Sequence, residues 1–181
     1  MNINDFVDER RRMVENQIMR RGLLEPRLLA VFESVPRHLF VPEEDRHLAY
    51  ADGPLPIGFG QTISQPYIVA LMTELLQLEG EEHVLEVGTG SGYQAAILSL
   101  LCAAVLTIEI VPSHADAAAA RLRALGFANV RVRHGDGHAG WPEEAPFDII
   151  MVTAAPATVP PALMDQLRIG GRLVIPVGPV G

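Results

Sequence analysis

The sequence predicts an α/β fold built on a doubly wound, mostly parallel sheet. From residue 66 onward, stretches rich in Val, Ile and Leu alternate with stretches of helical character. Apolar strands that alternate with helices are typical of a parallel sheet covered on both faces. The strands are expected at residues 83–88, 104–110, 129–134, 147–154 and 172–178, and the helices at residues 66–78, 92–102, 113–126 and 159–167.

The N-terminal third is expected to form helices and turns that precede this core. Charged residues dominate 5–21, but apolar residues recur there at a ragged helical spacing, and Gly22 supplies a stop. Pro26 can occupy the first turn of a second helix, which Pro36 ends. The following segment, 37–64, is rich in proline and glycine, which indicates turns and short strands.

Length and charge limit the classes of protein. The 181 residues are expected to form one domain, with 1–65 as N-terminal helices and a lid and 66–181 as the α/β core. The net charge of −8 argues against a nucleic-acid partner. The single cysteine, Cys102, lies in an apolar run and is expected to be buried. The longest uncharged apolar run, 95–108, is shorter than the roughly 20 residues needed to span a bilayer. The N-terminus also lacks a signal-peptide pattern. A cytoplasmic protein without a membrane partner is therefore expected.

A glycine-rich loop follows the first predicted strand of the core. In VLEVGTGSGYQAA, a buried strand leads into Gly88, Gly90 and Gly92, after which a helix begins. Glycines let a ligand approach the backbone closely, and a helix N-terminus favours electron-rich groups. Tyr93 stands where the dinucleotide-binding motif needs a glycine. The sequence therefore argues against an NAD dehydrogenase. The loop therefore indicates a nucleotide site, with a purely structural turn as the alternative.

Two acidic residues strengthen the nucleotide interpretation. Glu109 ends the second strand, where an acceptor can hold ribose hydroxyls, and Asp136 beside Gly137 follows the third strand, where an acid can meet an adenine edge. Taken singly, Glu109 could cap a helix and Asp136 could form a turn. Together they favour an adenosine-bearing ligand at the carboxyl edge of the sheet. A metal site at His134, Asp136 and His138 is disfavoured, because no fourth ligand lies nearby in the sequence.

Six stretches, in this order, closely resemble the protein-L-isoaspartate O-methyltransferase family: GQTISQP, VLEVGTGSGYQAA, TIE, GDG, APFDIIMVTAA and GGRLVIPVG. The glycine loop alone would indicate only the wider methyltransferase superfamily, whereas the TISQP turn is specific to this family. The resemblance implies a Rossmann-like methyltransferase fold and an enzyme that uses S-adenosylmethionine to repair proteins damaged by age.

The resemblance also implies a role for each matching residue. Glu109 would bind the ribose of S-adenosylmethionine, and Asp136 with Gly137 would contact its adenine. The N-terminal helices and the segment rich in proline and glycine would form a lid across the carboxyl edge of the sheet. The loop residues would pass close to the methionine portion of the cofactor: Gly88, Thr89, Gly90, Ser91 and Gly92.

Ser64, within TISQP, matches the active-site serine of the family. Sequence logic leaves two interpretations of its hydroxyl. It could bond to the start of the helix that begins at Pro66, or it could orient the substrate carboxylate or the cofactor without acting as a nucleophile. The family's substrate is an isoaspartyl residue, whose free α-carboxylate has an intrinsic pKa of about 3.5 and needs no general base.

The C-terminus is expected to depart from the family pattern. Methyltransferases of this architecture usually continue with two more strands, whereas this sequence stops at VIPVGPVG, so 172–178 is expected to form an exposed apolar edge. A truncated member that is weakly stable or self-associating is the resulting expectation. Two alternatives remain: a methyltransferase acting on a small molecule or RNA, and a non-catalytic relative that keeps the fold as a binding module.

Overall fold

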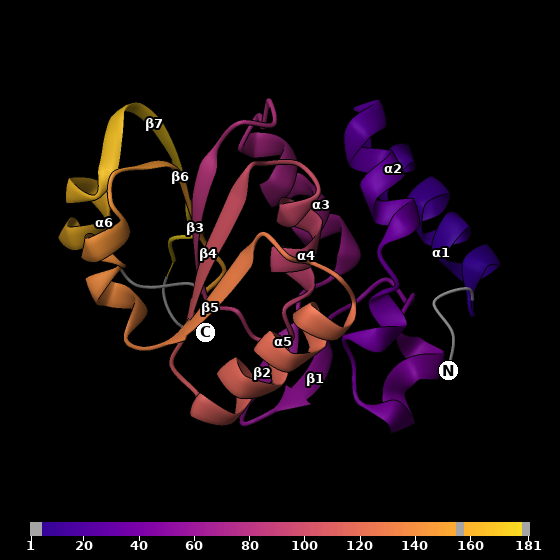
Figure 1. Ribbon diagram of the computed structural model, residues 1–181. Coiled ribbons are helices and arrows are strands. Elements are labelled where there is room, and N and C mark those ends of the chain that lie inside the picture. Colours follow the sequence, from indigo (N-terminus) through magenta and orange to yellow (C-terminus); the bar gives the residue numbers. More distant parts are fainter. Residues whose placement is uncertain (1–4, 155–157, 179–181) are drawn as a thin grey trace. The chain divides into compact units, whose positions relative to one another are not determined.

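The chain separates into two compact units, residues 1–75 and residues 76–181 (Figure 1). The computed structural model describes residues 5–154 and 158–178. The expectation of one domain with a division after residue 65 stays a prediction. Within the described ranges, no helix is both long enough and apolar enough to cross a membrane.

The first unit begins with a continuous helical run of changing pitch. Helix α1 (Val7–Met13) passes into a π-helical turn (Val14–Ile18) and then a 3-10 turn (Met19–Arg21). Gly22 ends the run with a φ of 92°, a conformation that glycine adopts without steric cost. Helix α2 (Pro26–Ser34) starts with proline in its first turn, where the missing N–H costs nothing. Both helices predicted here are confirmed.

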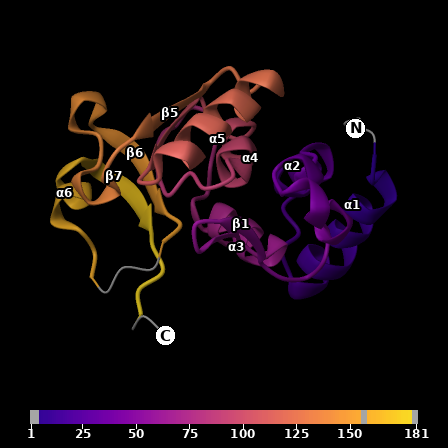
Figure 2. The same ribbon diagram turned by 90° about the horizontal axis from the view of Figure 1, so that it is seen from below.

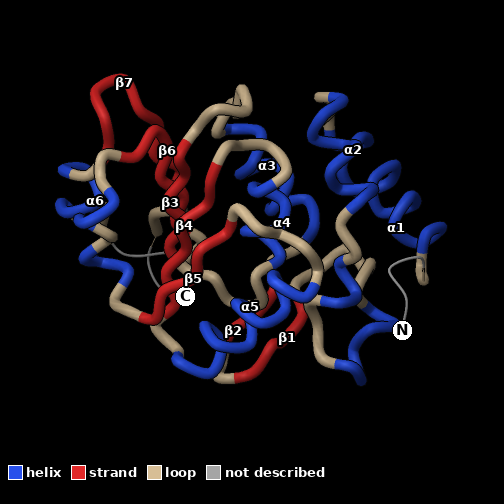
Figure 3. Tube along the Cα trace, in the orientation of Figure 1, coloured by secondary structure: helices blue, strands red, loops and turns tan. Residues whose placement is uncertain are grey.

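A small hairpin and a third helix complete the first unit (Figure 3). Strands β1 (Leu55–Gly58) and β2 (Gln61–Ile63) pair antiparallel, and α3 (Pro66–Leu75) follows. The helix is shorter than predicted, because Gln77 has a φ of 49°, outside the helical region. The core of this unit contains buried apolar side chains from its helices and turns, including Met13, Ile18, Phe32, Phe40, Ile63 and Val69.

The second unit is a parallel sheet with the strand order β5-β4-β3-β6-β7. The strands are β3 (His83–Val87), β4 (Ala104–Glu109), β5 (Val130–His134), β6 (Phe147–Val152) and β7 (Leu167–Val174).

Helices lie on both faces of this sheet. Helices α4 (Tyr93–Ser99) and α5 (Pro112–Ala124) cover one face, and α6 (Pro161–Asp165) lies on the other (Figures 1 and 2). The doubly wound parallel sheet predicted from the sequence is confirmed. A core cluster on the α6 side is buried between sheet and helix: Leu85, Leu106, Ile108, Trp141, Phe147, Ile150, Val152 and Leu163.

Strand β7 differs from its prediction, which placed a strand at 172–178. The strand begins at Leu167, and its pairing with β6 is interrupted by a bulge at 168–171. Gly170 adopts a φ of 80°, and a Cβ on Gly171 would lie 2.8 Å from a backbone carbonyl oxygen. The two glycines therefore permit a bulge that a regular alternation of apolar residues does not reveal.

Candidate cofactor site

The loop between β3 and α4 bends through left-handed backbone conformations. Gly88, Gly90 and Gly92 have φ values of 101°, 50° and 85°, which are costly for residues that carry a Cβ. A Cβ on Gly88 would lie 2.3 Å from Thr153 Oγ1, an impossible contact. The Thr153 N–H donates to the carbonyl of Val87 at 2.9 Å, which holds the two strand ends together. Glycine at position 88 is therefore required both by its backbone angle and by its neighbour.

The two polar side chains within the loop turn into the protein. Thr89 and Ser91 are 3% and 8% exposed. Thr89 Oγ1 lies 2.7 Å from Thr107 Oγ1, and Ser91 Oγ accepts a hydrogen bond from the Tyr93 N–H at 3.3 Å. These hydroxyls therefore fix the shape of the loop from the inside.

Glu109 joins the end of β4 to the glycine loop. Its carboxylate accepts a hydrogen bond from the Gly90 N–H at 2.7 Å and another from the Val111 N–H at 3.0 Å. The side chain is almost fully buried. These two N–H donors orient the Glu109 carboxylate directly beside the loop.

Asp136 and Gly137 follow the end of β5. The Asp136 side chain accepts a hydrogen bond from the His138 N–H at 2.9 Å at the start of a 3-10 turn (Gly137–Ala139), and this bond lowers the pKa of Asp136. A Cβ on Gly137 would lie 2.3 Å from Val87 Cγ1. Glycine therefore lets the turn after β5 approach the end of β3.

The parallel register brings these three segments to one edge. Val87 on β3 pairs with Ile108 on β4, and Glu109 pairs with His134 on β5. The glycine loop, Glu109 and Asp136 thus follow neighbouring strands at the same carboxyl edge, where open α/β sheets bind their ligands. The structure brings together every candidate cofactor residue. Ser64, the candidate catalytic residue, belongs to the first unit.

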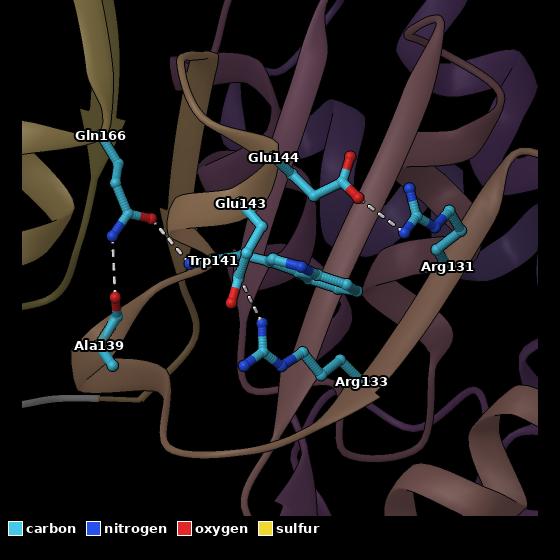
Figure 4. Close-up of polar contacts among 7 residues, drawn as sticks. All are labelled: Arg131, Arg133, Ala139, Trp141, Glu143, Glu144 and Gln166. Carbon is cyan, nitrogen blue, oxygen red and sulfur yellow. Dashed lines mark hydrogen bonds and ion pairs between the residues drawn. The ribbon is translucent and has the colours of Figure 1, made fainter.

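Gln166 holds the turn after β5 in place (Figure 4). Gln166 comes directly after α6 in the chain. Its side chain accepts a hydrogen bond from the Trp141 N–H at 2.7 Å and donates one to the carbonyl of Ala139 at 2.8 Å. Gly140 lies between these two contacts, and a Cβ there would be 2.3 Å from the Gln166 amide oxygen. The sequence analysis missed Gln166, because its partners lie far away in the chain and no local motif marks them.

Glu86 is a second residue that the sequence analysis missed. It is fully buried on β3, and Thr107 Oγ1 donates a hydrogen bond to Glu86 Oε2 at 2.6 Å. Burial raises the pKa of Glu86 from 4.5 to about 8, with the nearby charge of Glu109 adding to the rise and the Thr107 hydrogen bond opposing it. Through Thr107, Glu86 is linked to Thr89 in the glycine loop. The available signal was an acid in the middle of an apolar strand, HVLEV.

Ser64 lies between β2 and α3, and its backbone is fixed by Arg37. The fully buried Arg37 side chain donates from Nη2 to the Ser64 carbonyl and from Nε to the Ala49 carbonyl, both at 2.8 Å. The Ser64 hydroxyl makes no hydrogen bond to any residue in the described part of the chain, including the first turn of α3. The described residues thus give no hydrogen bond from the Ser64 hydroxyl to the start of α3, and the role of this hydroxyl stays a prediction.

The other polar residues of the TISQP turn are held from within the first unit. Gln65 donates to Asp52 Oδ1 at 2.7 Å, and Asp52 also forms an ion pair with Arg21. The guanidinium carbon of Arg21 lies 4.8 Å from the centre of the Tyr67 ring. The hydrogen bond from Arg21 lowers the pKa of Asp52, and these contacts give the turn a defined shape.

Two further residues from the sequence analysis can be placed. Cys102 is buried as predicted, and burial raises the pKa of its thiol to about 12. His138 Nδ1 lies 3.2 Å from Asp136 Oδ1. Across residues 5–154 and 158–178, no group of three or more His, Cys, Asp or Glu side chains is arranged to hold a metal ion.

The residues at the carboxyl edge fit the chemistry of S-adenosylmethionine, the cofactor that the resemblance implies. Ribose hydroxyls, an adenine amino group and an ammonium group are hydrogen-bond donors, and ionised carboxylates are acceptors only. Glu109 supplies a carboxylate beside the loop, and the Asp136 side chain is 63% exposed and able to receive a donor. The left-handed glycines leave the loop without side chains at three of its five positions.

A comparison with family models decides the family. The model described as protein-L-isoaspartate (D-aspartate) O-methyltransferase matches residues 8–181. The chain belongs to this family. The predicted family, fold, enzyme class and cofactor are therefore confirmed at the level of the protein-L-isoaspartate O-methyltransferases.

Individual relatives agree with the family model. A protein-L-isoaspartate O-methyltransferase of Synechococcus sp. is 57% identical over 173 residues, which cover 96% of this chain and 71% of the relative. One of Trichlorobacter lovleyi is 60% identical over 174 residues, which cover 96% of this chain and 80% of the relative.

Two solved structures of protein-L-isoaspartate O-methyltransferases have the same fold. The first has a TM-score of 0.82 at 31% identity over 92% of this chain, which spans only 55% of that structure. The second, from Plasmodium falciparum and in complex with S-adenosyl-L-homocysteine, has a TM-score of 0.80 at 25% identity and covers 94% of this chain and 84% of that one.

Proposed function

We propose that this chain transfers a methyl group from S-adenosylmethionine to the free α-carboxylate of isoaspartyl residues in damaged proteins. The observation that carries the proposal is the convergence of the glycine loop, Glu109 and Asp136 at one sheet edge, in a chain of the protein-L-isoaspartate O-methyltransferase family. D-Aspartyl residues, which the family description includes, are a second class of acceptor to test.

Each cofactor residue has a separate part in this proposal. The backbone of Gly88–Gly92 holds the methionine portion, with Thr89 and Ser91 supporting the loop from the inside. Glu109 accepts hydrogen bonds from the ribose, and Asp136 with Gly137 contacts the adenine. When bound, S-adenosylmethionine supplies a methyl group on a positively charged sulfur.

The protein then needs to position groups rather than to move protons. The α-carboxylate of an isoaspartyl residue, with a pKa of about 3.5, is already ionised at neutral pH, so the reaction requires no general base. Positioning of two reactants in line can contribute about 7 to 11 kcal/mol in well-oriented systems. Rigid anchoring of the glycine loop by Glu109 and Thr153 suits this requirement.

Ser64 is proposed to orient the substrate carboxylate. Its hydroxyl has no hydrogen bond to the described residues, while Arg37 fixes its backbone, so the side chain is available to a ligand at a defined place. A serine hydroxyl can donate to a carboxylate oxygen, and this contact requires no change in the charge of Ser64.

The test uses a pair of peptides that differ only in one linkage. The chain is incubated with S-adenosylmethionine carrying a labelled methyl group and with either an isoaspartyl peptide or its normal aspartyl counterpart, and base-labile methyl ester is counted. Label on the isoaspartyl peptide alone is expected. Label on neither peptide from folded protein, or equal label on both, contradicts the proposal, and label on added RNA would favour another methyltransferase.

A cytoplasmic location, the absence of nucleic-acid and membrane partners, and self-association through 172–178 remain predictions. Sedimentation of the purified chain at several concentrations checks self-association, which requires a larger sedimentation coefficient as the concentration rises.

A further inference from the structure

A groove runs along the outer edge of β5 in the second unit. Its volume is about 560 Å³. Side chains from the end of α5, from the segment after it, from β5 itself and from the turn after β5 line the groove. The larger apolar residues of its lining are Leu122, Phe127, Val130, Val132 and Trp141. This volume is within the range of about 300 to 1,000 Å³ that is usual for binding sites.

The backbone along this groove is free to pair with another strand. Strand β5 is the last strand of the sheet in the part of the chain that the structure describes. At the two ends of its pairing with β4, the Val105 N–H donates to the Asn129 carbonyl and the Gly135 N–H donates to the Glu109 carbonyl. Odd-numbered residues of β5 therefore direct their backbone groups toward β4. Because successive residues alternate, the N–H and C=O groups of the even-numbered residues point into the groove.

Side chains from both faces of the sheet meet at this edge. Val130 and Val132 line the groove on the α5 side together with Leu122. On the opposite face, Arg131 and Arg133 pack against Trp141, with guanidinium carbons 5.3 Å and 5.1 Å from its ring centre (Figure 4). The groove thus wraps around the strand edge, which is the position that an added strand would occupy.

The groove also differs in charge from the chain as a whole. Arg123, Arg131 and Arg133 line it, although the chain carries a net charge of −8. Glu144 and Glu143 form ion pairs with Arg131 and Arg133 at 2.8 Å and 3.0 Å and hold them in place (Figure 4).

Arg123 adds a charge that these glutamates do not balance. Arg123 has no ion pair with any carboxylate in the described part of the chain. Three arginines against two glutamates leave a positive lining, which favours a partner with acidic side chains.

We propose that the edge groove binds an extended, acidic peptide segment, which adds to the sheet beside β5. The backbone groups of Val130 and Val132 pair with the segment, their half-buried side chains and that of Phe127 contact its apolar side chains, and Arg123 contacts its carboxylates. This partner surface lies along the strand rather than at its carboxyl end, so it is separate from the cofactor site and does not depend on the proposed methyl transfer.

The sole tryptophan of the chain, Trp141, provides the readout, because it lines the groove. The full chain is titrated with an acetylated, amidated peptide of alternating valine and glutamate, and tryptophan fluorescence is followed. Two N-methylated versions of the peptide carry the methyl groups on alternate residues in opposite phase. The unmodified peptide is expected to give a saturable change, and one N-methylated phase is expected to bind about tenfold more weakly, since two hydrogen bonds are lost, while the other phase binds normally.

Charge is tested by a matched pair of variants. Arg123→Glu is expected to weaken binding of the acidic peptide about fivefold, whereas Arg20→Glu, the same charge change at an exposed residue of the other unit, leaves it unchanged. Replacement of the peptide's glutamates by lysine is expected to abolish the fluorescence change.

Three results would overturn the proposal. They are a fluorescence that does not respond to the acidic peptide, equal binding of the two N-methylated phases, and equal binding of the lysine peptide. Circular dichroism of each variant shows whether the fold is retained. The N-methylated peptides test strand pairing without any change to the protein.

Discussion

Replacement of Glu86 by Gln is expected to remove a pH-dependent loss of stability. The pKa of Glu86 is raised from 4.5 to about 8, so at pH values between these two the folded chain holds a proton that the unfolded chain releases. Stability conferred by this proton is fully present below pH 4.5 and is lost as the pH rises toward 8. Each pH unit in this window corresponds to about 1.36 kcal/mol, so the loss between pH 5 and pH 7 is about 2.7 kcal/mol.

The amide of Gln copies the protonated acid in size and in charge. Its oxygen can accept the hydrogen bond that Thr107 Oγ1 donates to Glu86 Oε2, and its NH₂ group takes the place of Glu86 Oε1, which has no hydrogen bond among the described residues. Urea unfolding at pH 5, 6, 7 and 8, followed by the fluorescence of Trp141 in the same unit, measures the free energy of unfolding.

The expected result is a growing advantage for the Glu86→Gln variant as the pH rises, with a slope of about 1.36 kcal/mol per pH unit between pH 5 and 7. Glu81→Gln, at an exposed residue of the same unit, serves as the control, and its advantage should not change with pH. Parallel stability curves for the Glu86→Gln variant and the unaltered chain would refute the buried, protonated state of Glu86.

Three other substitutions test the site. Gly137→Ala is expected to lower the free energy of unfolding by about 1 to 3 kcal/mol, because the added Cβ would lie 2.3 Å from Val87 Cγ1. Gly135→Ala is the matched control, since a Cβ there has its nearest contacts at 3.7 Å. Equal urea midpoints for the two variants would contradict the packing argument. Gln166→Leu leaves the Trp141 N–H and the Ala139 carbonyl without their hydrogen-bond partner. The free energy of unfolding is expected to fall by about 2 kcal/mol, and S-adenosylhomocysteine is expected to bind more weakly in calorimetry. Unchanged affinity would show that cofactor binding does not depend on the contacts of Gln166 with the turn after β5. Ser64→Ala is expected to lower kcat/KM for an isoaspartyl peptide about 10- to 100-fold with an unchanged melting temperature, and a wild-type rate would exclude the orienting role.

Local sequence signals predicted the parts of the site that depend on the backbone. The glycines of the loop could be recognised because a strand leads into them and a helix follows, and the structure gives Gly88, Gly90 and Gly92 the left-handed angles that explain their presence. The position of Glu109 beside the loop followed from parallel strand order, because neighbouring strands end at the same edge.

Contacts between distant segments could not be read from the sequence. Gln166 acts on a turn that lies 25 residues before it at Trp141, and neither residue belongs to a motif. The bulge in β7 depends on how Gly171 meets the backbone of β6, which a periodic pattern of apolar residues does not specify. The sequence left two interpretations of the Ser64 hydroxyl open for a related reason, since spacing alone does not fix where a hydroxyl points.

The hydrogen bonds that connect the glycine loop to the interior of the sheet have a direction. A hydroxyl carries a single proton, and Thr107 donates its proton to Glu86. The 2.7 Å contact between Thr89 and Thr107 must then be a donation from Thr89. Thr89 is only 3% exposed, so its proton is committed to the interior, and replacement of Thr107 would break the link between the loop and Glu86 at both of its hydrogen bonds.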